Sequence, residues 1–294
     1  MVEKEGRWKL ESLNFRNAMK RIVCILFLLG GCLSLYAQTN QKVKISYQKM
    51  GDGLYDFYAE NPNFYPVQLE LKFTEFENMQ ANCDLPYVST IGHGKQLLFN
   101  LKRTFIDLPG AFKYTYTTRI GAYPVHPDEN VVYQLPVEKE KQTTIIDFDF
   151  TNSQTPNKII WGFEMNEGDI VCACRGGIVC QITEVQMRDS IAVGDNTVTI
   201  LHPDLTFGKY ELLAEHSISV ELGDTVKADD PIAKVGKNKF TKVPHVRFSV
   251  YYVNACIDSI NENRLRNIYS YIEPFFTANE GERFHLVADE NYTK

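Results

Sequence analysis

The chain has 294 residues, of which 44% are apolar and 23% charged, and its formal charge at pH 7 is −6. This is the composition of a globular protein that is long enough for one large or two modest domains. An acidic chain of this kind has no electrostatic footprint for nucleic acid or for an anionic membrane surface, which excludes both as partners.

The first 37 residues have the pattern of a secretory signal. A basic start at Met19 precedes an apolar run over residues 22–35, and the small residue Ala37 comes before polar residues. This pattern predicts a signal peptide over residues 1–37, with Met19 as the true start. Cys32 offers an alternative, as a lipobox cysteine. We therefore expect an exported protein, periplasmic or extracellular, or an outer-membrane lipoprotein if Cys32 is lipidated.

Five cysteines remain after residue 37, where 25 Lys and Arg also stand against 34 Asp and Glu, a formal charge of −9. The odd number leaves at least one thiol without a partner in the chain. Cys172 and Cys180 flank a Gly-Gly turn and could form a disulfide, while Cys172 and Cys174 share a strand face and could bind a metal. Packing as small buried residues is favoured. The pairing is left open among Cys83, Cys172, Cys174, Cys180 and Cys256.

The segment over residues 41–150 alternates apolar and polar residues, as strands with one buried face do. Gly, Pro and Asn clusters separate the alternating runs, which predicts an antiparallel β-sandwich over residues 38–137. Its many Tyr and Phe residues fit a β core better than a sugar-stacking surface. A joint is predicted at Leu135-Pro136-Val137, before the charged run over residues 138–141.

The segment over residues 138–276 is predicted to be a second all-β domain, followed by a C-terminal tail over 277–294, of which residues 280–294 are polar and expected to be frayed. Short apolar runs here are broken by Gly-Asp and Gly-Gly turns. Five sequence blocks stand out, which begin at Met165, Ile170, Thr199, Val220 and Pro244: MNEGD, IVCACRGGIV, TILHPDLT, VELGDTV with PIAKVG, and PHVRFSV.

These blocks resemble, in order and spacing, the core of the LytM/lysostaphin-type zinc metallopeptidases, which are peptidoglycan endopeptidases. That family reads roughly MPEGTPVYAARDGIV, then HPDG with Tyr-x-His-Leu, then VKVGDxVKxGQPIAxVG and PHLHFEV. The resemblance implies the all-β core known as the duplicated hybrid motif over residues 162–253. The segment Tyr133–Lys139 is also similar to the sequence that joins a β-sandwich to this core in some exported relatives.

The same resemblance implies that the zinc ligands are missing. The ligand Asp of the family falls on Gly162, and no His lies near Ser153, where the first ligand His belongs. Arg247 replaces the second His of His-x-His, and Leu212 replaces the His of Tyr-x-His-Leu. Gly and Leu offer no donor atom, and Arg is always protonated. We therefore expect no zinc and no intact catalytic set, with His245 as the remnant.

Three residues are predicted to line the former substrate groove: His245, Arg247 and Tyr210. Positions 245 and 247 share one face of a strand, and the guanidinium of Arg247 could hold a peptide carboxylate in a bidentate pair. An ordinary surface arginine paired with a nearby acid is the alternative. A metal site rebuilt from His216, Glu211, Asp204 and Glu164 is a further, less favoured one.

The sequence thus favours a catalytically inactive, peptidase-like protein that acts in cell-wall binding or in regulation of a cell-wall hydrolase. The partner is expected to be a peptidoglycan peptide or a cell-wall amidase of the divisome type. Alternatives are an active metalloendopeptidase with a non-standard site and a structural or adhesive surface protein. A lipoyl-type carrier would share the hairpin at Gly223 and Pro231, but it needs an exposed Lys in a Met-Lys-Met turn, which is absent.

Overall fold

The computed structural model describes residues 41–147, 158–184, 196–236, 243–254, 268–278 and 282–294, and within these ranges every regular element is a strand. The predictions about the signal peptide, Met19, Cys32 and Cys256 fall on residues outside these ranges. The strands are β1 (Lys44–Gly51), β2 (Leu54–Asn61), β3 (Val67–Glu77), β4 (Met79–Ala81), β5 (Tyr87–Ile91), β6 (Gly94–Arg103), β7 (Ala111–Ile120), β8 (Val132–Gln134), β9 (Gln142–Asp147), β10 (Trp161–Glu164), β11 (Ile170–Cys172), β12 (Gly177–Thr183), β13 (Asn196–Leu201), β14 (Phe207–Leu213), β15 (Thr225–Val226), β16 (Pro231–Lys234), β17 (His245–Asn254), β18 (Ile268–Ile272), β19 (Phe275–Thr277) and β20 (Asn291–Thr293).

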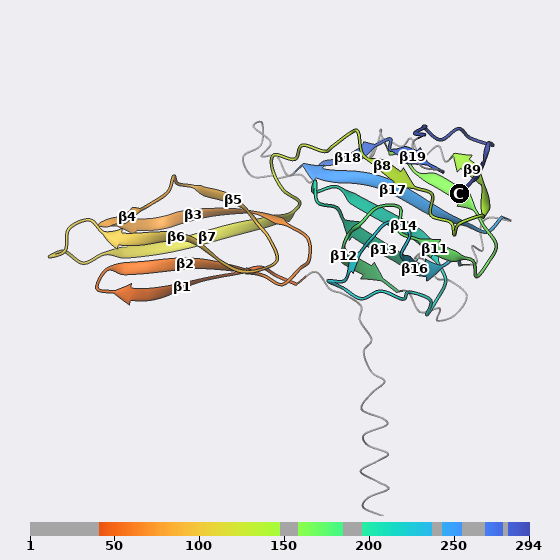
Figure 1. The fold of residues 1–294 in the computed structure, drawn as a ribbon. Coiled ribbons are helices and arrows are strands. Elements are labelled where there is room, and N and C mark those ends of the chain that lie inside the picture. Colours follow the sequence, from red (N-terminus) through yellow and green to blue (C-terminus); the bar gives the residue numbers. More distant parts are fainter. Residues whose placement is uncertain (1–40, 148–157, 185–195, 237–242, 255–267, 279–281) are drawn as a thin grey trace, which may run out of the picture. The chain divides into compact units, whose positions relative to one another are not determined.

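The predicted N-terminal sandwich consists of two antiparallel sheets, with strand orders β1-β2-β6-β4 and β5-β3-β7 (Figure 1). Aromatic rings fill the space between them. Phe57 is fully buried and stacks on Phe99 at 4.8 Å between ring centroids, and Tyr87 packs on Phe99 as well. The density of aromatic residues in this half is therefore largely explained by packing of the sandwich.

Two tyrosines protect the free edge of β1, which would otherwise expose unpaired backbone groups. Tyr114 and Tyr116 of the edge strand β7 donate hydrogen bonds from their hydroxyls to the carbonyls of Ile45 (3.4 Å) and Val43 (3.2 Å). An edge strand with unpaired carbonyls is a site for unwanted strand pairing, so these contacts close the sandwich on this side.

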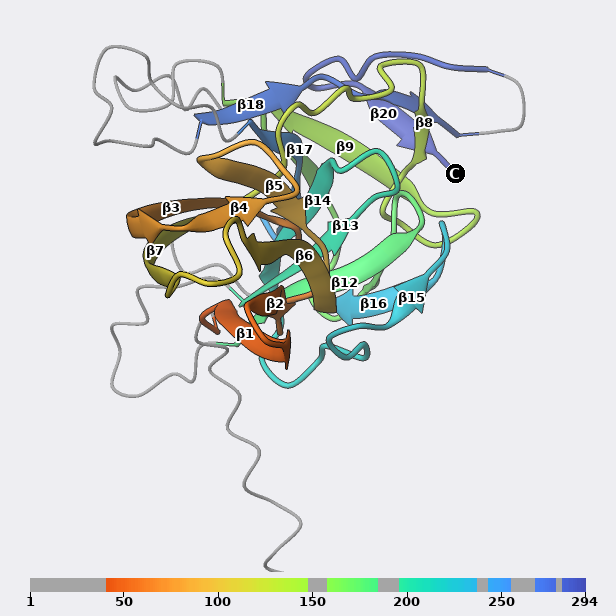
Figure 2. The ribbon, with the colours of Figure 1, turned by 90° about the vertical axis from the view of Figure 1, so that its left-hand side faces the viewer.

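The segment predicted to be the second β domain forms a nine-stranded sheet, in the order β15-β12-β13-β14-β17-β10-β9-β20, with β18 beside the second half of β17 (Figure 2). All these pairs are antiparallel. Elsewhere in the described chain β19 pairs with β8 in parallel. The all-β prediction is therefore confirmed.

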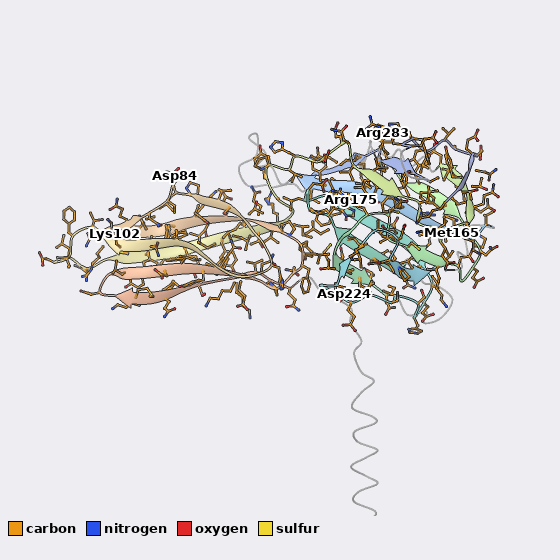
Figure 3. All side chains as sticks on the ribbon, in the orientation of Figure 1. Asp84, Lys102, Met165, Arg175, Asp224 and Arg283 are labelled. Carbon is orange, nitrogen blue, oxygen red and sulfur yellow. The ribbon has the colours of Figure 1, made fainter. Side chains whose placement is uncertain are left out.

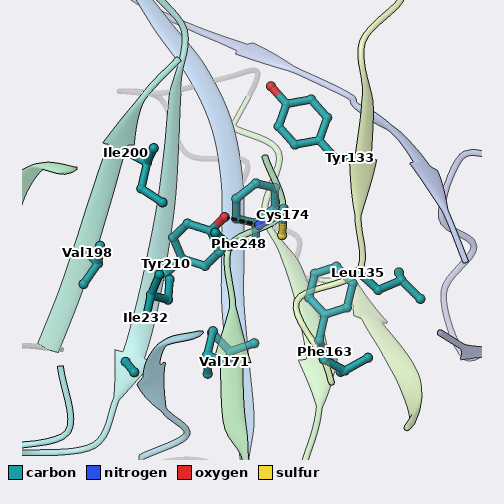
Figure 4. Close-up of a cluster of buried hydrophobic side chains, with 14 of the residues drawn as sticks. Tyr133, Leu135, Phe163, Val171, Cys174, Val198, Ile200, Tyr210, Ile232 and Phe248 are labelled. Atoms are coloured by element: carbon teal, nitrogen blue, oxygen red, sulfur yellow. Dashed lines mark hydrogen bonds between the residues drawn. The ribbon is translucent and has the colours of Figure 1, made fainter. Parts of the chain in front are cut away.

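One face of this sheet carries the hydrophobic core. Tyr210, Phe248 and Phe163 are fully buried there, and the short pair β11–β16 packs over them with Val171 and Ile232 (Figure 4). The Tyr210 hydroxyl accepts a hydrogen bond of 2.6 Å from the backbone N–H of Cys174. This bond satisfies a backbone donor inside the core and ties a turn to the centre of the sheet.

The C-terminal segment is not frayed, contrary to the prediction. Strand β20 pairs with β9, and Leu286 is 4% exposed. The ammonium of Lys294 donates to the carbonyls of Leu135 (2.7 Å) and Val137 (2.9 Å) and pairs with Asp229 at 2.5 Å. The polar composition concealed this docking, because backbone hydrogen bonds and one lysine add to the few apolar residues of the segment, Phe284, Leu286 and Tyr292, that pack on the core. The domain boundaries at 137/138 and 276/277 stay predictions.

The described cysteines are free thiols, so the alternative of a Cys172–Cys180 disulfide is wrong. Cys172, Cys174 and Cys180 are buried, which agrees with packing as small apolar residues. Burial raises the pKa of Cys174 and of Cys180 to about 12 each. Neutral thiols are poor nucleophiles and poor metal ligands, so these three act as core residues.

No helix in the described ranges has the length and apolarity to cross a membrane.

Candidate functional site

The face of the nine-stranded sheet opposite the core carries polar residues in register across neighbouring strands. Arg247 of β17 pairs with Gly162 of β10 on one side and with Glu211 of β14 on the other, and Glu211 pairs with Thr197 of β13. Directly paired residues on antiparallel strands point to the same face. These four positions therefore form one row across the sheet.

A second row lies beside the first, formed by Ser249, Lys209 and Thr199. We call the two rows together the polar strip: Thr197, Glu211, Arg247, Gly162, Thr199, Lys209 and Ser249. Thr197, Thr199 and Ser249 are buried, whereas Lys209 keeps 34% of its side chain exposed. The strip thus combines hydroxyl groups with charged groups on a surface that is largely shielded from water.

The charges of the strip are two cations and one anion. The ammonium of Lys209 lies 2.5 Å from a carboxylate oxygen of Glu211, whose side chain is only 14% exposed. Arg247 lies directly across the ladder from Glu211. Charge pairs that are partly removed from water interact more strongly than exposed ones, so the Lys209–Glu211 pair is stronger here than it would be in full contact with water.

Tyrosines border the strip where β17 continues toward β18. Tyr251 pairs with Tyr271 across these strands and stacks on Phe207 at 5.3 Å between ring centroids. Burial, followed by the nearby Glu211 carboxylate, raises the pKa of Tyr271. Burial also raises the pKa of Tyr251. Both phenols stay neutral at physiological pH and can serve as hydrogen-bonding groups.

The structure separates the three residues predicted to line the groove. His245 and Arg247 lie two residues apart on one face of β17, as expected from strand geometry. Tyr210 is different, because it pairs with Phe248 on the core face, is fully buried and uses its hydroxyl for Cys174. Its assignment to the groove is therefore a correction: a one-residue step along β14 moves a side chain to the other face.

His245 is 1% exposed, and its Nδ1–H donates to the carbonyl of Val243 at 2.9 Å. The residue opposite it on β10 is Glu164, which is exposed. The His245 side chain is thus covered by neighbouring residues and has little surface for contact with a ligand.

The residues on the former ligand positions do not fit a zinc ion. A zinc site needs three deprotonated donors around one point. Gly162 has no side chain, and the guanidinium of Arg247 beside it is cationic. Leu212, which stands where the resemblance implies an auxiliary His and not a ligand, has a side chain of carbon atoms only. Among the described residues no three His, Cys, Asp or Glu side chains are grouped closely enough to hold a metal ion.

The residues considered for a rebuilt metal site are dispersed. His216 is 71% exposed at its side chain and lies near Glu215 at 3.4 Å, while Glu211 is engaged with Lys209. Asp204 belongs to a different cluster, described next, and Glu164 is exposed. The less favoured idea of a site built from these four residues is not supported by their placement.

Sequence reasoning missed a polar cluster around Arg175, which is labelled in Figure 3. Its guanidinium donates to Asp204 at 3.0 Å, to the Tyr133 hydroxyl at 3.1 Å and to Thr206 at 3.3 Å. Burial alone would raise the pKa of the Asp204 carboxyl, but the hydrogen bonds from Thr206 and Arg175 outweigh it and lower that pKa. The cluster joins the chain around Tyr133 to the hairpin between β13 and β14. The HPDL block, which contains Asp204, was the feature of the sequence that could have indicated this cluster.

His202 sits next to this cluster and is 1% exposed. Its Nδ1–H donates to the carbonyl of Gly176 at 2.9 Å. Burial lowers the pKa of His202 to about 4, so the imidazole is neutral. Its Nε2 faces Gly208, where a Cβ would lie 2.7 Å from that nitrogen. The histidine of the HPDL block is therefore a structural residue.

Residues 161–259 match the model of peptidase family M23. Among solved structures, the catalytic domain of lysostaphin from Staphylococcus simulans is similar at 21% identity, over 36% of this chain and 72% of that chain, with a TM-score of 0.26. Whole lysostaphin is similar at 23% identity, over 36% of this chain and 40% of that chain, with a TM-score of 0.25. A structure of the SpoIIQ–SpoIIIAH pore-forming complex is similar at 20% identity, over 46% and 87%, with a TM-score of 0.32.

No curated protein matches the chain. In the comparison with lysostaphin, the chain spans 40% of that protein's length. The resemblance to the LytM/lysostaphin-type peptidases is confirmed for residues 161–259 by the M23 match. Within that segment, Gly162 and Arg247 stand where the resemblance implies zinc ligands, and Leu212 stands where it implies the auxiliary His of Tyr-x-His-Leu.

Proposed function

We propose that this M23-type protein does not hydrolyse peptides but binds them, and that the polar strip holds the carboxylate of a peptidoglycan peptide. The observation that carries the proposal is the position of Arg247, in the middle of the strip and on the strand where the family has a ligand histidine. A guanidinium in that place can form two parallel hydrogen bonds to a carboxylate.

The surroundings of Arg247 favour this ligand over a neutral one. Lys209 and Glu211 form an ion pair within the strip, and Arg247 adds a second positive charge beside them. The buried hydroxyls of Thr197, Thr199 and Ser249 lie on the same face. A peptide carboxylate could accept charge-assisted hydrogen bonds from the guanidinium of Arg247 and from the ammonium of Lys209, whose side chain is 34% exposed.

The loss of hydrolysis is supported by donor chemistry. Metal-dependent hydrolysis needs a bound ion that polarises the scissile carbonyl and activates water. The residues at the former ligand positions, Gly162 and Arg247, supply no lone pair for such an ion. We further propose, from the signal pattern that begins at Met19, that the protein acts outside the cytoplasm.

The test is a binding assay with purified peptidoglycan and with a cell-wall tetrapeptide as competitor. We expect the peptide with a free C-terminal carboxylate to compete at least about tenfold better than its amide, and Arg247→Ala to lose at least about tenfold in affinity, as expected for a charge-assisted bidentate contact. Arg247→Lys should restore only part of this loss, because an ammonium cannot form the planar fork. Arg283→Ala, an exposed arginine that stacks on Phe275, is the matched control and should bind normally.

Two results would overturn the proposal. One is release of peptide fragments from peptidoglycan by purified protein that holds one zinc per chain, which would establish the alternative of an active endopeptidase. The other is peptide binding that Arg247→Ala leaves unchanged. A protein that binds a purified cell-wall amidase but neither peptidoglycan nor the tetrapeptide would instead place the function in hydrolase regulation, the other role that the family resemblance implies.

A further inference from the structure

The loop between β6 and β7 presents apolar side chains to solvent at the end of the N-terminal sandwich. Phe105 is 64% exposed, Ile106 is 72% exposed and Leu108 is 55% exposed. Single exposed apolar residues are common on protein surfaces and need no explanation. Three large ones within four residues are different, because contiguous exposed apolar surface marks interaction sites.

The backbone of this loop is held in place chiefly by the side chain of Asn78. Its Oδ1 accepts from the N–H of Phe105 at 2.8 Å, and its Nδ2 donates to the carbonyls of Phe105 and Leu108, each at 2.9 Å. The N–H of Leu108 donates to the carbonyl of Phe105 at 3.3 Å and closes a turn, with Ile106 and Asp107 at its tip. A loop fixed in this way loses little conformational entropy when it binds.

The neighbouring turn between β1 and β2 extends this surface. The N–H of Arg103 donates to the carbonyl of Gly53 at 2.9 Å, and the Arg103 side chain forms an ion pair with Asp52. Leu54, which is 48% exposed, pairs directly with Lys102, whose position near the end of the sheet is labelled in Figure 3. The two connections thus form one rigid end of the sandwich, with apolar side chains on it. We call it the apolar tip: Leu54, Phe105, Ile106 and Leu108.

The charge within the apolar tip distinguishes between the occupants that could cover it. Asp107 is exposed, lies between Ile106 and Leu108 in sequence, and makes no ion pair with any residue in the described part of the chain. Insertion of the tip into lipid would bring this carboxylate into an apolar medium, which is costly. A protein pocket can avoid that cost, since it can place a cation beside the carboxylate.

We propose that the apolar tip docks into a pocket of a second, different protein, and that this pocket is apolar inside and has a Lys or Arg at its rim opposite Asp107. The site is separate from the polar strip and does not depend on what that strip binds. Ile106, at the tip of the turn, would be the residue buried most deeply, with Phe105 and Leu108 on either side.

The test starts from a photo-crosslinking residue, p-benzoylphenylalanine, placed at Phe105 of the full chain in the cell of origin. We expect one discrete protein adduct. The crosslinked protein is then purified, and its affinity for the variants is measured by calorimetry. Ile106→Asp should weaken binding at least about 100-fold, as loss of a central anchor does. Asp107→Lys should weaken it at least about tenfold, because it opposes the rim cation.

Matched controls use residues elsewhere on the same sandwich. Val88→Asp changes an apolar residue that is 43% exposed, and Asp84→Lys changes an exposed acid (Figure 3). Both should bind within about twofold of the wild type, as substitutions outside an interface do. The melting temperature of Ile106→Asp should equal that of the wild type, since Ile106 has no place in the core.

Four outcomes would overturn the proposal. The first is the absence of a discrete adduct, and the second is an affinity that Ile106→Asp leaves unchanged. The third is co-sedimentation of the wild type, but not of Ile106→Asp, with vesicles of phosphatidylcholine and phosphatidylglycerol. The fourth is self-association in sedimentation velocity that Ile106→Asp abolishes, which would make a second copy of this chain the occupant.

Discussion

The two faces of strand β17 differ in what their residues do, although the residues alternate along one chain. Phe248 is fully buried and packs on Tyr210 at 4.8 Å between ring centroids. Arg247, the residue before it, lies on the opposite face beside Gly162 and Glu211. Successive side chains of a strand point to opposite faces, so one face can keep a core while the other changes its chemistry.

This separation explains how a chain can keep the M23-type scaffold and yet carry residues that do not fit zinc. The core face depends on volume and apolarity, as the cluster around Tyr210, Phe163 and Phe248 shows (Figure 4). The polar strip depends on which donors and charges it presents. Replacement of a ligand by Gly or Arg on one face creates no cavity on the other. The predictions below test how independent the two faces are.

The largest expected effect is on the core face. Phe248→Ala should lower the free energy of unfolding by about 3–5 kcal/mol, since it leaves a cavity among Tyr210, Tyr133 and Phe276. Urea denaturation measures the change. Ser249→Ala, one residue further on the polar strip, should cost less than about 1.5 kcal/mol because it removes a single hydroxyl group and leaves no large cavity. Equal losses in the two variants would contradict the separation of the faces.

The next effect is a dependence of stability on pH that comes from His202. The folded protein holds this imidazole neutral, with its pKa lowered to about 4, whereas an unfolded chain protonates it near pH 6.5. Between these values the unfolded state binds more protons, so stability is full above pH 6.5 and falls as the pH drops toward 4, by about 3 kcal/mol in total. His202→Gln should lack this part of the decline when both proteins are unfolded in urea at pH 7 and pH 4.5. A parallel decline in the variant would exclude His202 as its source.

A smaller effect is expected from the hydroxyl of Tyr210. Tyr210→Phe keeps the ring but leaves the N–H of Cys174 buried without its 2.6 Å partner. A buried unsatisfied donor costs about 1–3 kcal/mol, which thermal or urea unfolding would detect. Peptidoglycan binding by this variant should be unchanged, because the hydroxyl faces the core. Loss of binding with intact stability would return Tyr210 to the groove, where sequence analysis placed it.

The smallest effect on stability is expected at Arg247. Arg247→Ala should change the free energy of unfolding by less than about 1 kcal/mol, because the side chain leaves the sheet on the face opposite the core. The same variant is expected to lose peptide binding. Phe248→Ala should therefore mainly reduce stability, and Arg247→Ala should mainly reduce affinity for the peptide. A loss of several kcal/mol at Arg247 would show that the polar strip helps to hold the fold together.

Much of the candidate site followed from sequence. The period of two predicted that His245 and Arg247 share a face, and the sequence blocks matched Gly162 to the ligand Asp of the family. The pairing of Arg247 with Glu211 did not follow, since the register between strands depends on contacts distant in sequence. Tyr210 was misplaced for the same reason: the motif gave its position in the chain, and only the register gave its face.

The sequence by itself determined that the protein is all-β, that it resembles an M23 core, and that Gly162 and Arg247, which stand where the resemblance implies zinc ligands, carry no side-chain lone pair for a metal. These features are local, because alternation, turn residues and donor atoms can be read one position at a time. The tertiary structure alone decided that β20 docks on β9, that Asn78 fixes the apolar tip, and that Arg175 gathers Tyr133, Asp204 and Thr206. Each joins segments that are distant along the chain, and such contacts are specified by the packing of the whole fold and not by the local pattern of any one segment.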